Sequence, residues 1–250
     1  MNAISSLDRI RIVLVETSHP GNLGAAARAM KTMGLARLYL ANPQTPADAH
    51  AIAMATSSAD VLHGAIICES LEEALAGTIL AVAMTARRRD LSHPSMDVRE
   101  AAVQAVSEAR QGDVAFVFGG EMSGLSNEDV LKCQRIAHIP TDPETSSLNL
   151  AAAVQVVCYE LLMAASEKEL PPPPRFPLAT FDDVENFYQH LEKTLTEIRF
   201  LNPENPKRLM TRIRRMFTRI RLEREEVQIL RGVLKMISRA LRRTGSIRKD

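Results

Sequence analysis

The first two-thirds of the chain alternate short apolar runs with helix-like stretches, and this alternation restricts the fold more than any other feature. The apolar runs cover residues 10–15, 37–40, 65–68, 79–84, 114–118 and 135–139. Residues 25–33 and 71–76 have helical spacing, and each stretch is followed by a glycine, which is typical of a helix end. Strands that alternate with helices form mostly parallel sheets covered on both faces. We therefore predict an α/β fold with a mostly parallel sheet, ending in a buried helix over 148–165.

Four consecutive prolines at 171–174 mark the clearest boundary in the chain. Proline lacks a backbone N–H and favours extended segments. We therefore predict one domain over 1–168, a proline-rich linker over 169–178 and a small helical extension over 179–250. In the extension, Thr180 and Asp183 have the spacing of a capping box, and Asn205-Pro206 is typical of a helix start. A further helix is predicted over about 223–241.

The charges are divided unevenly between these parts. Residues 1–202 contain 16 Lys and Arg against 25 Asp and Glu, whereas residues 203–250 contain 15 against 5. The net charge of +1 therefore averages an acidic part and a basic part. Because basic helices commonly face polyanions, the extension is predicted to bind one.

The cysteines and histidines indicate a reduced protein without a metal site. Cys68, Cys133 and Cys158 lie far apart and form no C-x-x-C pair, which is typical of cytoplasmic proteins. His19 and the other histidines have no partners at metal-ligand spacing. No apolar run approaches the roughly 20 residues that span a bilayer, and no signal-peptide pattern is present. We expect a cytoplasmic protein that needs neither a membrane nor a metal.

Three polar or glycine-rich islands follow apolar runs and precede helix-like patterns. They cover residues 19–28, 118–126 and 143–150, so all three are predicted at strand-to-helix turns, where α/β sheets build ligand sites. On its own, each island is also compatible with a plain turn or helix cap. A dinucleotide-binding loop is a poor fit to the first island, because the next apolar run ends in Ala41-Asn42 without the expected acidic residue.

Taken together, the islands resemble the three signature motifs of SPOUT-class, S-adenosylmethionine-dependent RNA methyltransferases. The matching residues are Asn22, Gly24 and Arg28 in the first motif, Gly119, Glu121, Gly124 and Leu125 in the second, and Ser147, Leu148 and Asn149 in the third. The resemblance covers the chain to about residue 168. The sequence of residues 11–22 is especially similar to that found in the TrmJ branch, whose members also carry a helical C-terminal extension.

The resemblance implies properties that the residue patterns alone do not. It implies a deep trefoil knot in the last part of the sheet, a cofactor bound within that knot, and a homodimer that completes the active site. Carried over position by position, it implies that S-adenosylmethionine contacts Met84, Thr85, Ala86, Gly119, Ile139, Ser146, Ser147 and Leu148.

The implied reaction is transfer of a methyl group to the ribose 2′-hydroxyl of cytidine or uridine 32 in the tRNA anticodon loop. Arg28 is the implied catalytic residue, and Asn22, Glu121, Ser147 and Asn149 are expected to position Arg28 and the ribose. A guanidinium stays protonated in ordinary protein surroundings. Arg28 is therefore expected to act either as a base or as a clamp on the neighbouring phosphate.

Two other functions fit the same sequence. The chain could methylate another tRNA position or ribosomal RNA, or it could bind RNA without catalysis on a related fold. The resemblance implies a basic residue where this chain has Gly120, which bears on the choice of substrate. The Arg87-Arg88-Arg89 run either contacts RNA phosphates or is a solvated charged segment.

Overall fold

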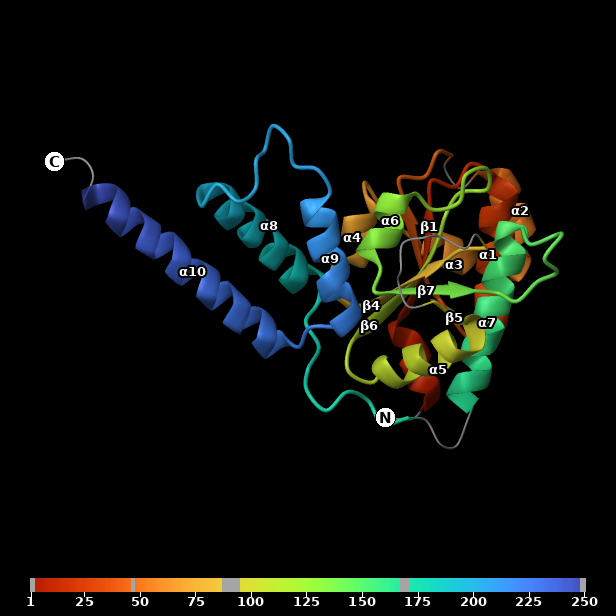
Figure 1. The fold of residues 1–250 in the computed structure, drawn as a ribbon. Coiled ribbons are helices and arrows are strands. Elements are labelled where there is room, and N and C mark those ends of the chain that lie inside the picture. Colours follow the sequence, from red (N-terminus) through yellow and green to blue (C-terminus); the bar gives the residue numbers. More distant parts are fainter. Residues whose placement is uncertain (1–2, 46–47, 87–94, 167–170, 248–250) are drawn as a thin grey trace. The chain divides into compact units, whose positions relative to one another are not determined.

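The computed structural model describes residues 3–45, 48–86, 95–166 and 171–247. The chain forms two compact units, residues 1–174 and residues 175–250 (Figure 1). The Arg87–Arg89 run lies outside the described residues, as does part of the expected linker.

The first unit is built on a seven-stranded sheet with the order β3-β2-β1-β6-β4-β7-β5. Every paired strand runs parallel to its neighbour in the described part of the chain. The α/β class is therefore confirmed. The strands are β1 (Ile10–Val15), β2 (Arg37–Ala41), β3 (Ile66–Cys68), β4 (Thr78–Met84), β5 (Ser95–Asp97), β6 (Asp113–Phe118) and β7 (Arg135–His138).

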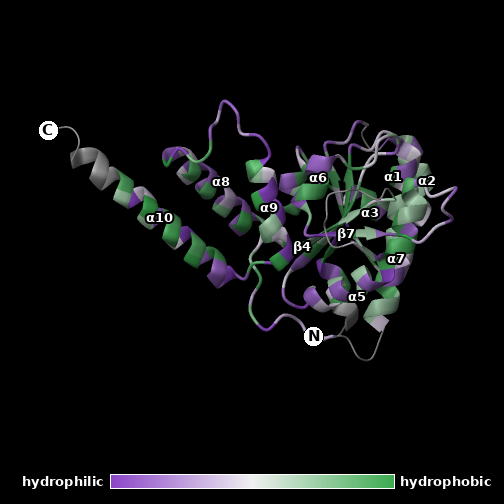
Figure 2. Cartoon of the chain, in the orientation of Figure 1, coloured by the Kyte–Doolittle hydropathy of each residue, from purple (hydrophilic) through white to green (hydrophobic). Residues whose placement is uncertain are grey.

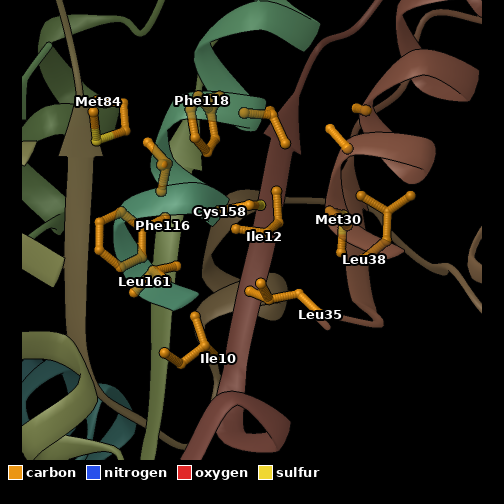
Figure 3. Packing of buried hydrophobic residues seen from close by; sticks show 14 of the residues in the cluster. Ile10, Ile12, Met30, Leu35, Leu38, Met84, Phe116, Phe118, Cys158 and Leu161 are labelled. Atoms are coloured by element: carbon orange, nitrogen blue, oxygen red, sulfur yellow. The ribbon is translucent and has the colours of Figure 1, made fainter. Parts of the chain in front are cut away.

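Helices cover both faces of this sheet. Their bounds are η1 (Ala3–Arg9), α1 (Pro20–Thr32), α2 (Ala49–Ala55), η2 (Thr56–Ser58), α3 (Ala59–His63), α4 (Leu71–Leu75), α5 (Val98–Glu108), α6 (Asn127–Lys132) and α7 (Leu150–Ser166). Ile10 and Ile12 pack with α1, α5 and α7 in one apolar cluster (Figure 3). Arg11, between them on β1, reaches α4 instead, and Lys132 of α6 pairs with Glu72 of α4. Because neighbouring residues of a strand point to opposite faces, α4 and α6 cover the second face.

The core on the first face is aliphatic with a few larger side chains. Phe116, Leu161 and Met30 are fully buried there, and Cys158 of α7 lies among them (Figure 3). Cys68 and Cys133 are buried as well, and burial raises the pKa of all three thiols. Strands β1 and β4 are buried at every position, as expected for a parallel sheet covered on both faces, and hydrophobic residues also recur along α7 (Figure 2).

An ion-pair network joins the starts of three strands. Arg11 donates to Asp113 Oδ2 over 2.7 Å and to the carbonyl oxygens of Ala74 and Ala76 over 3.0 and 2.8 Å. Arg37 donates to the same carboxylate oxygen over 2.8 Å. Burial alone would raise the pKa of Asp113, but the hydrogen bonds and charges of the two arginines lower it below its ordinary value. These hydrogen bonds hold β1, β2 and β6 together at the end of the sheet opposite the segments that carry the three motifs.

One local expectation for the first unit is corrected, and one strand had not been predicted. Asn22 and Gly24 were expected in a turn, but α1 already begins at Pro20, so both lie in its first turns. Proline favours the first helical position, because its φ angle is fixed and its missing N–H has no partner there in any case. Strand β5 escaped prediction because its Ser95–Asp97 sequence is short and polar.

The second unit contains α8 (Phe181–Glu197), α9 (Leu209–Ile220) and α10 (Arg224–Ile247). The rings of Phe187, Tyr188 and Phe217 contact one another in tilted and edge-to-face arrangements, and Val227 and Leu234 of α10 complete the buried cluster. The Thr180 capping box is confirmed, since its side chain accepts from Asp183 N and the Asp183 side chain accepts from Thr180 N. None of the helices in the described residues is long and apolar enough to cross a membrane.

The expected helix start at Asn205-Pro206 is wrong. Helix α9 begins at Leu209, after an N-cap at Arg208. Lys207 has a φ angle of 50°, which belongs to the left-handed region. Because a right-handed helix cannot pass through such a residue, the helix begins after it.

Candidate active site

The three motifs meet at one edge of the sheet. Parallel strands β1, β6, β4 and β7 end side by side, and the segments that follow them carry Asn22, Glu121, Thr85 and Ile139 in turn. The register pairs Leu14 of β1 with Phe118 of β6, so the first two motifs leave the sheet at the same level. This is the edge at which α/β sheets commonly bind ligands.

Four hydrogen bonds from residues 18–22, the segment that leads into the first motif and includes its Asn22, hold the Glu121 carboxylate. Its Oε2 accepts hydrogen bonds from Ser18 N over 3.2 Å and from Ser18 Oγ over 3.0 Å. Its Oε1 accepts from His19 N over 3.3 Å and from Asn22 Nδ2 over 2.9 Å. Both carboxylate oxygens therefore accept hydrogen bonds from a segment about one hundred residues away in the sequence.

These donors also keep Glu121 charged. Partial burial raises its pKa, but the hydrogen bonds from Asn22 and Ser18 outweigh burial and lower the pKa below its ordinary value. At neutral pH the side chain is therefore a carboxylate that accepts hydrogen bonds. It is suited to orient Asn22 and not to donate a proton.

Asn149 of the third motif extends this arrangement. Its Nδ2 donates to Asn22 Oδ1 over 3.0 Å. Its Oδ1 accepts from Ala151 N over 2.9 Å and so caps the start of α7, which explains why that helix begins two residues after the expected Leu148. Glu121, Asn22 and Asn149 thus form one hydrogen-bonded chain that joins all three motifs; below it is called the motif bridge.

A pocket opens beside Glu121 at the ends of β4, β6 and β7. Its lining brings together all eight residues expected at the cofactor: Met84, Thr85, Ala86, Gly119, Ile139, Ser146, Ser147 and Leu148. Sequence reasoning missed further lining residues, among them Phe118, Thr141, Leu150 and Ala153. Their apolar or common side chains carry no motif signal, and only the fold brings them to the pocket.

Glycines allow the second motif to fold tightly over this pocket. A Cβ atom on Gly119 would lie 2.1 Å from the backbone of Gly124 and Leu125, and one on Gly120 would lie 2.7 Å from the carbonyl oxygen of Glu16. Gly124 has a φ angle of 66°, which glycine adopts readily. The basic residue that the resemblance implies at Gly120 would therefore require the backbone of this chain to shift.

A second hollow borders the motif bridge at Asn22 and Asn149. It is lined by His19, Pro20, Gly21, Asn22, Ala25, His50, Met54 and Asn149. A Cβ atom on Gly21 would lie 3.0 Å from His50 Nε2, and one on Gly24 would lie 2.1 Å from the carbonyl oxygen of Ala51. The glycines of the first motif therefore let α2 approach α1 and bring His50 to the hollow, a role that sequence reasoning missed.

Arg28 stands apart from the motif bridge. Its side chain is exposed on α1, and the described residues that line the two hollows do not include it. It follows Gly21 and Ala25 by seven and three residues, which places it on their side of the helix. The structure thus brings Asn22, Glu121 and Asn149 together and Ser147 to the neighbouring pocket, but not Arg28.

Comparison with known proteins identifies the family. The model of the SpoU rRNA Methylase family matches residues 9–159, and that of the tRNA methyltransferase TrmJ C-terminal domain matches residues 182–246. The tRNA (cytidine/uridine-2'-O-)-methyltransferase TrmJ of Pectobacterium atrosepticum is 47% identical over 236 residues, covering 93% of this chain and 98% of that protein. This chain belongs to the TrmJ branch of the SpoU methylase family.

Solved structures agree with this assignment. The crystal structure of TrmJ from Z. mobilis ZM4 matches with a TM-score of 0.81 at 31% identity, covering 91% of this chain and 98% of that one. The SpoU methyltransferase AviRb from Streptomyces viridochromogenes, solved in complex with the cofactor AdoMet, shares the fold at 23% identity with a TM-score of 0.51, covering 62% of this chain and 60% of that one. The SPOUT resemblance and its TrmJ branch are thus confirmed. In the portion of this TrmJ-branch chain that the structure describes, no cluster of three or more His, Cys, Asp or Glu residues is arranged to hold a metal.

Proposed function

We propose that this chain transfers a methyl group from S-adenosylmethionine to the ribose 2′-hydroxyl of cytidine or uridine 32 in the tRNA anticodon loop. The observation that carries the proposal is the motif bridge, in which Glu121, Asn22 and Asn149 join three motifs between a pocket and a second hollow. Relatives nearly half identical over most of the chain are tRNA (cytidine/uridine-2'-O-)-methyltransferases.

The pocket beside Glu121 suits S-adenosylmethionine. Its described lining combines apolar side chains such as Met84 and Leu148 with the hydroxyls of Ser146 and Ser147, which fits a nucleoside with polar edges. The charged group of this lining is the Glu121 carboxylate, which favours a cationic ligand over a phosphate. The cofactor would supply a methyl group already activated by the positive charge of its sulfonium.

The motif bridge is suited to position the other reactant. Asn22 and Asn149 line the second hollow, and their amides are held in place by Glu121 and by the start of α7. We assign the target ribose to this hollow, where its 2′-hydroxyl would face the cofactor pocket. Such positioning would supply much of the rate enhancement in an in-line displacement, in which the 2′-oxygen forms a bond to the methyl carbon, the sulfur–carbon bond breaks to leave a neutral thioether, and the hydroxyl proton passes to water.

Arg28 is assigned to the phosphate beside that ribose. Arg28 is exposed, and the N–H donors of a guanidinium form a planar fork that matches two oxygens of a phosphate, so we assign it a bidentate contact with that phosphate and not the removal of a proton. A homodimer would bring a second copy to complete the site. The exposed side chains of Tyr159 and Met163 on α7, 46% and 47% accessible, offer an apolar surface for it. The trefoil knot and the cytoplasmic location stay predictions.

The decisive experiment maps the methylated nucleotide. Full-length protein is incubated with a set of unmodified tRNAs, ribosomal RNA and labelled S-adenosylmethionine, and nuclease fragments are analysed by mass spectrometry. The proposal expects a 2′-O-methyl group on nucleotide 32 of tRNA. Methylation at another position or on ribosomal RNA would favour a related 2′-O-methyltransferase. RNA binding without calorimetric binding of the cofactor would favour a non-catalytic RNA-binding protein.

A further inference from the structure

The second unit contains a groove whose walls carry cations from two helices. It runs between α8 and α10 and is lined by His190, Lys193, Glu197, Lys235, Ser238 and Arg239. We propose that this groove, called the basic groove below, binds the phosphate backbone of the substrate RNA. The inference rests on the proposed function and names the residues through which the basic unit would hold its substrate.

The packing of the two helices determines the shape of the groove. Val227 and Leu234 of α10 are buried in the cluster that also contains Phe187 of α8. Ser238 follows on the same side of α10, is 8% exposed, and donates to Glu197 over 2.9 Å. Lys235 and Arg239 flank Ser238 and therefore lie at the rim of this contact. Buried contacts between α8 and α10 therefore form the floor of the groove, and its rim is open to solvent.

The cations of the basic groove are available to a ligand. Within the described residues, no carboxylate is paired with Lys193, Lys235 or Arg239, and all three are exposed. The arginine at the centre of the unit is different, because Arg214 forms two hydrogen bonds with Glu185 and stacks on Tyr188. Arg214 therefore stabilises the fold, whereas the three groove cations have no carboxylate partner among the residues that the structure describes.

The chemistry of the groove favours a nucleic acid backbone. Lys235 and Arg239 are one helical turn apart, about 6 Å along α10, with Lys193 on the facing wall, so the cations form a short row. Such rows of Lys and Arg neutralise successive phosphates without reading sequence. The carboxylate of the groove, Glu197, is engaged by Ser238, which reduces its opposition to an anion.

The test neutralises the groove and compares it with an equal loss of charge elsewhere. In the full-length chain, Lys193, Lys235 and Arg239 are changed to Gln, and the matched control changes the exposed Lys207, Arg208 and Arg212 to Gln. Binding of labelled tRNA is measured by fluorescence anisotropy across a salt series. The groove variant is expected to lower the slope of log affinity against log salt by about two, and the affinity by roughly tenfold at moderate salt. The control variant is expected to change both quantities less.

A gain of binding separates the groove from a folding defect. The conservative change Glu197→Gln keeps an oxygen for Ser238 and removes the opposing charge, so tRNA affinity is expected to rise by about twofold to threefold at low salt. Equal effects of groove and control variants, or an unchanged affinity in Glu197→Gln, would overturn the assignment. If the unaltered chain binds tRNA but does not methylate it, the proposed function is contradicted. The assignment of the basic groove to RNA binding is then unaffected.

Discussion

Asn22 is the residue on which the candidate site depends most directly. It touches Glu121 through one end of its amide and Asn149 through the other, and it lines the second hollow but not the cofactor pocket. Changing Asn22 to Ala removes both hydrogen bonds. Methyl transfer in single turnovers is expected to slow by about 10²-fold, because the ribose and the neighbouring groups lose their alignment. Cofactor affinity, measured by calorimetry, is expected to stay within about threefold of the unaltered chain; an equal loss of affinity would contradict the separation of the two hollows.

Arg28 is expected to act through its charge. Arg28→Ala should slow methyl transfer by about 10²-fold or more while cofactor affinity is unchanged, since Arg28 is absent from the described lining of the pocket. Arg28→Lys keeps a positive charge and should retain part of the methyl-transfer rate, but it loses the bidentate contact with the phosphate. Initial rates with saturating cofactor and varied tRNA measure both variants. Full methylation by Arg28→Ala would refute the assignment.

At the scale of the elements, the network around Asp113 should govern acid stability. Its lowered pKa means that the folded chain holds Asp113 as a carboxylate more strongly than the unfolded chain does. The associated free energy of unfolding is present above the unfolded pKa of about 4 and is lost as pH falls through the lower folded pKa. Asp113→Asn should reduce the free energy of unfolding by about 3 kcal/mol at pH 7, because it leaves Arg11 buried without its charge partner.

Urea unfolding at pH 7 and near pH 3 checks this prediction. The difference between the unaltered chain and Asp113→Asn should shrink at the lower pH, because Asp113 takes up a proton in the unfolded chain, whose pKa is about 4, before it does so in the folded chain. Asp60→Asn is a suitable control, because Asp60 also pairs with a cation, Lys31, but at an exposed position. A pH-independent difference for Asp113 would indicate that packing, not charge, is responsible.

Elements with a strong local signal were predictable from the sequence. Strands β1, β4 and β6 are mostly apolar, and the predicted bounds of each lie within one residue of the observed ones. Strand β5 and the start of α9 were not, since the first depends on pairing with β7 and the second on the left-handed backbone of Lys207. In the site, Asn22, Glu121 and Asn149 were found through motif resemblance. Ser18 and His50 were not, because their roles arise only when distant segments meet.

At the scale of the whole molecule, the two compact units suggest a division of labour. The pocket that we assign to the cofactor lies entirely within the first unit, whereas the basic groove belongs to the second. Deleting residues 175–250 should therefore lower tRNA affinity much more than cofactor affinity, and should weaken the salt dependence of the remaining tRNA binding. Calorimetry with S-adenosylmethionine and anisotropy with tRNA measure the two affinities. Unchanged tRNA binding would contradict this division.

The motif bridge also links the chemistry to the order in which the chain is made. Asn22 and its partner Asn149 are 127 positions apart, and Glu121 lies between them in the sequence. A ribosome adds about 5 to 20 residues per second and releases the N-terminal part first. During that time a nascent chain contains Asn22 and Glu121 but lacks the start of α7. Prematurely terminated products that end before Asn149 therefore cannot form the motif bridge. The three bridge residues can come together only when synthesis has reached the start of α7.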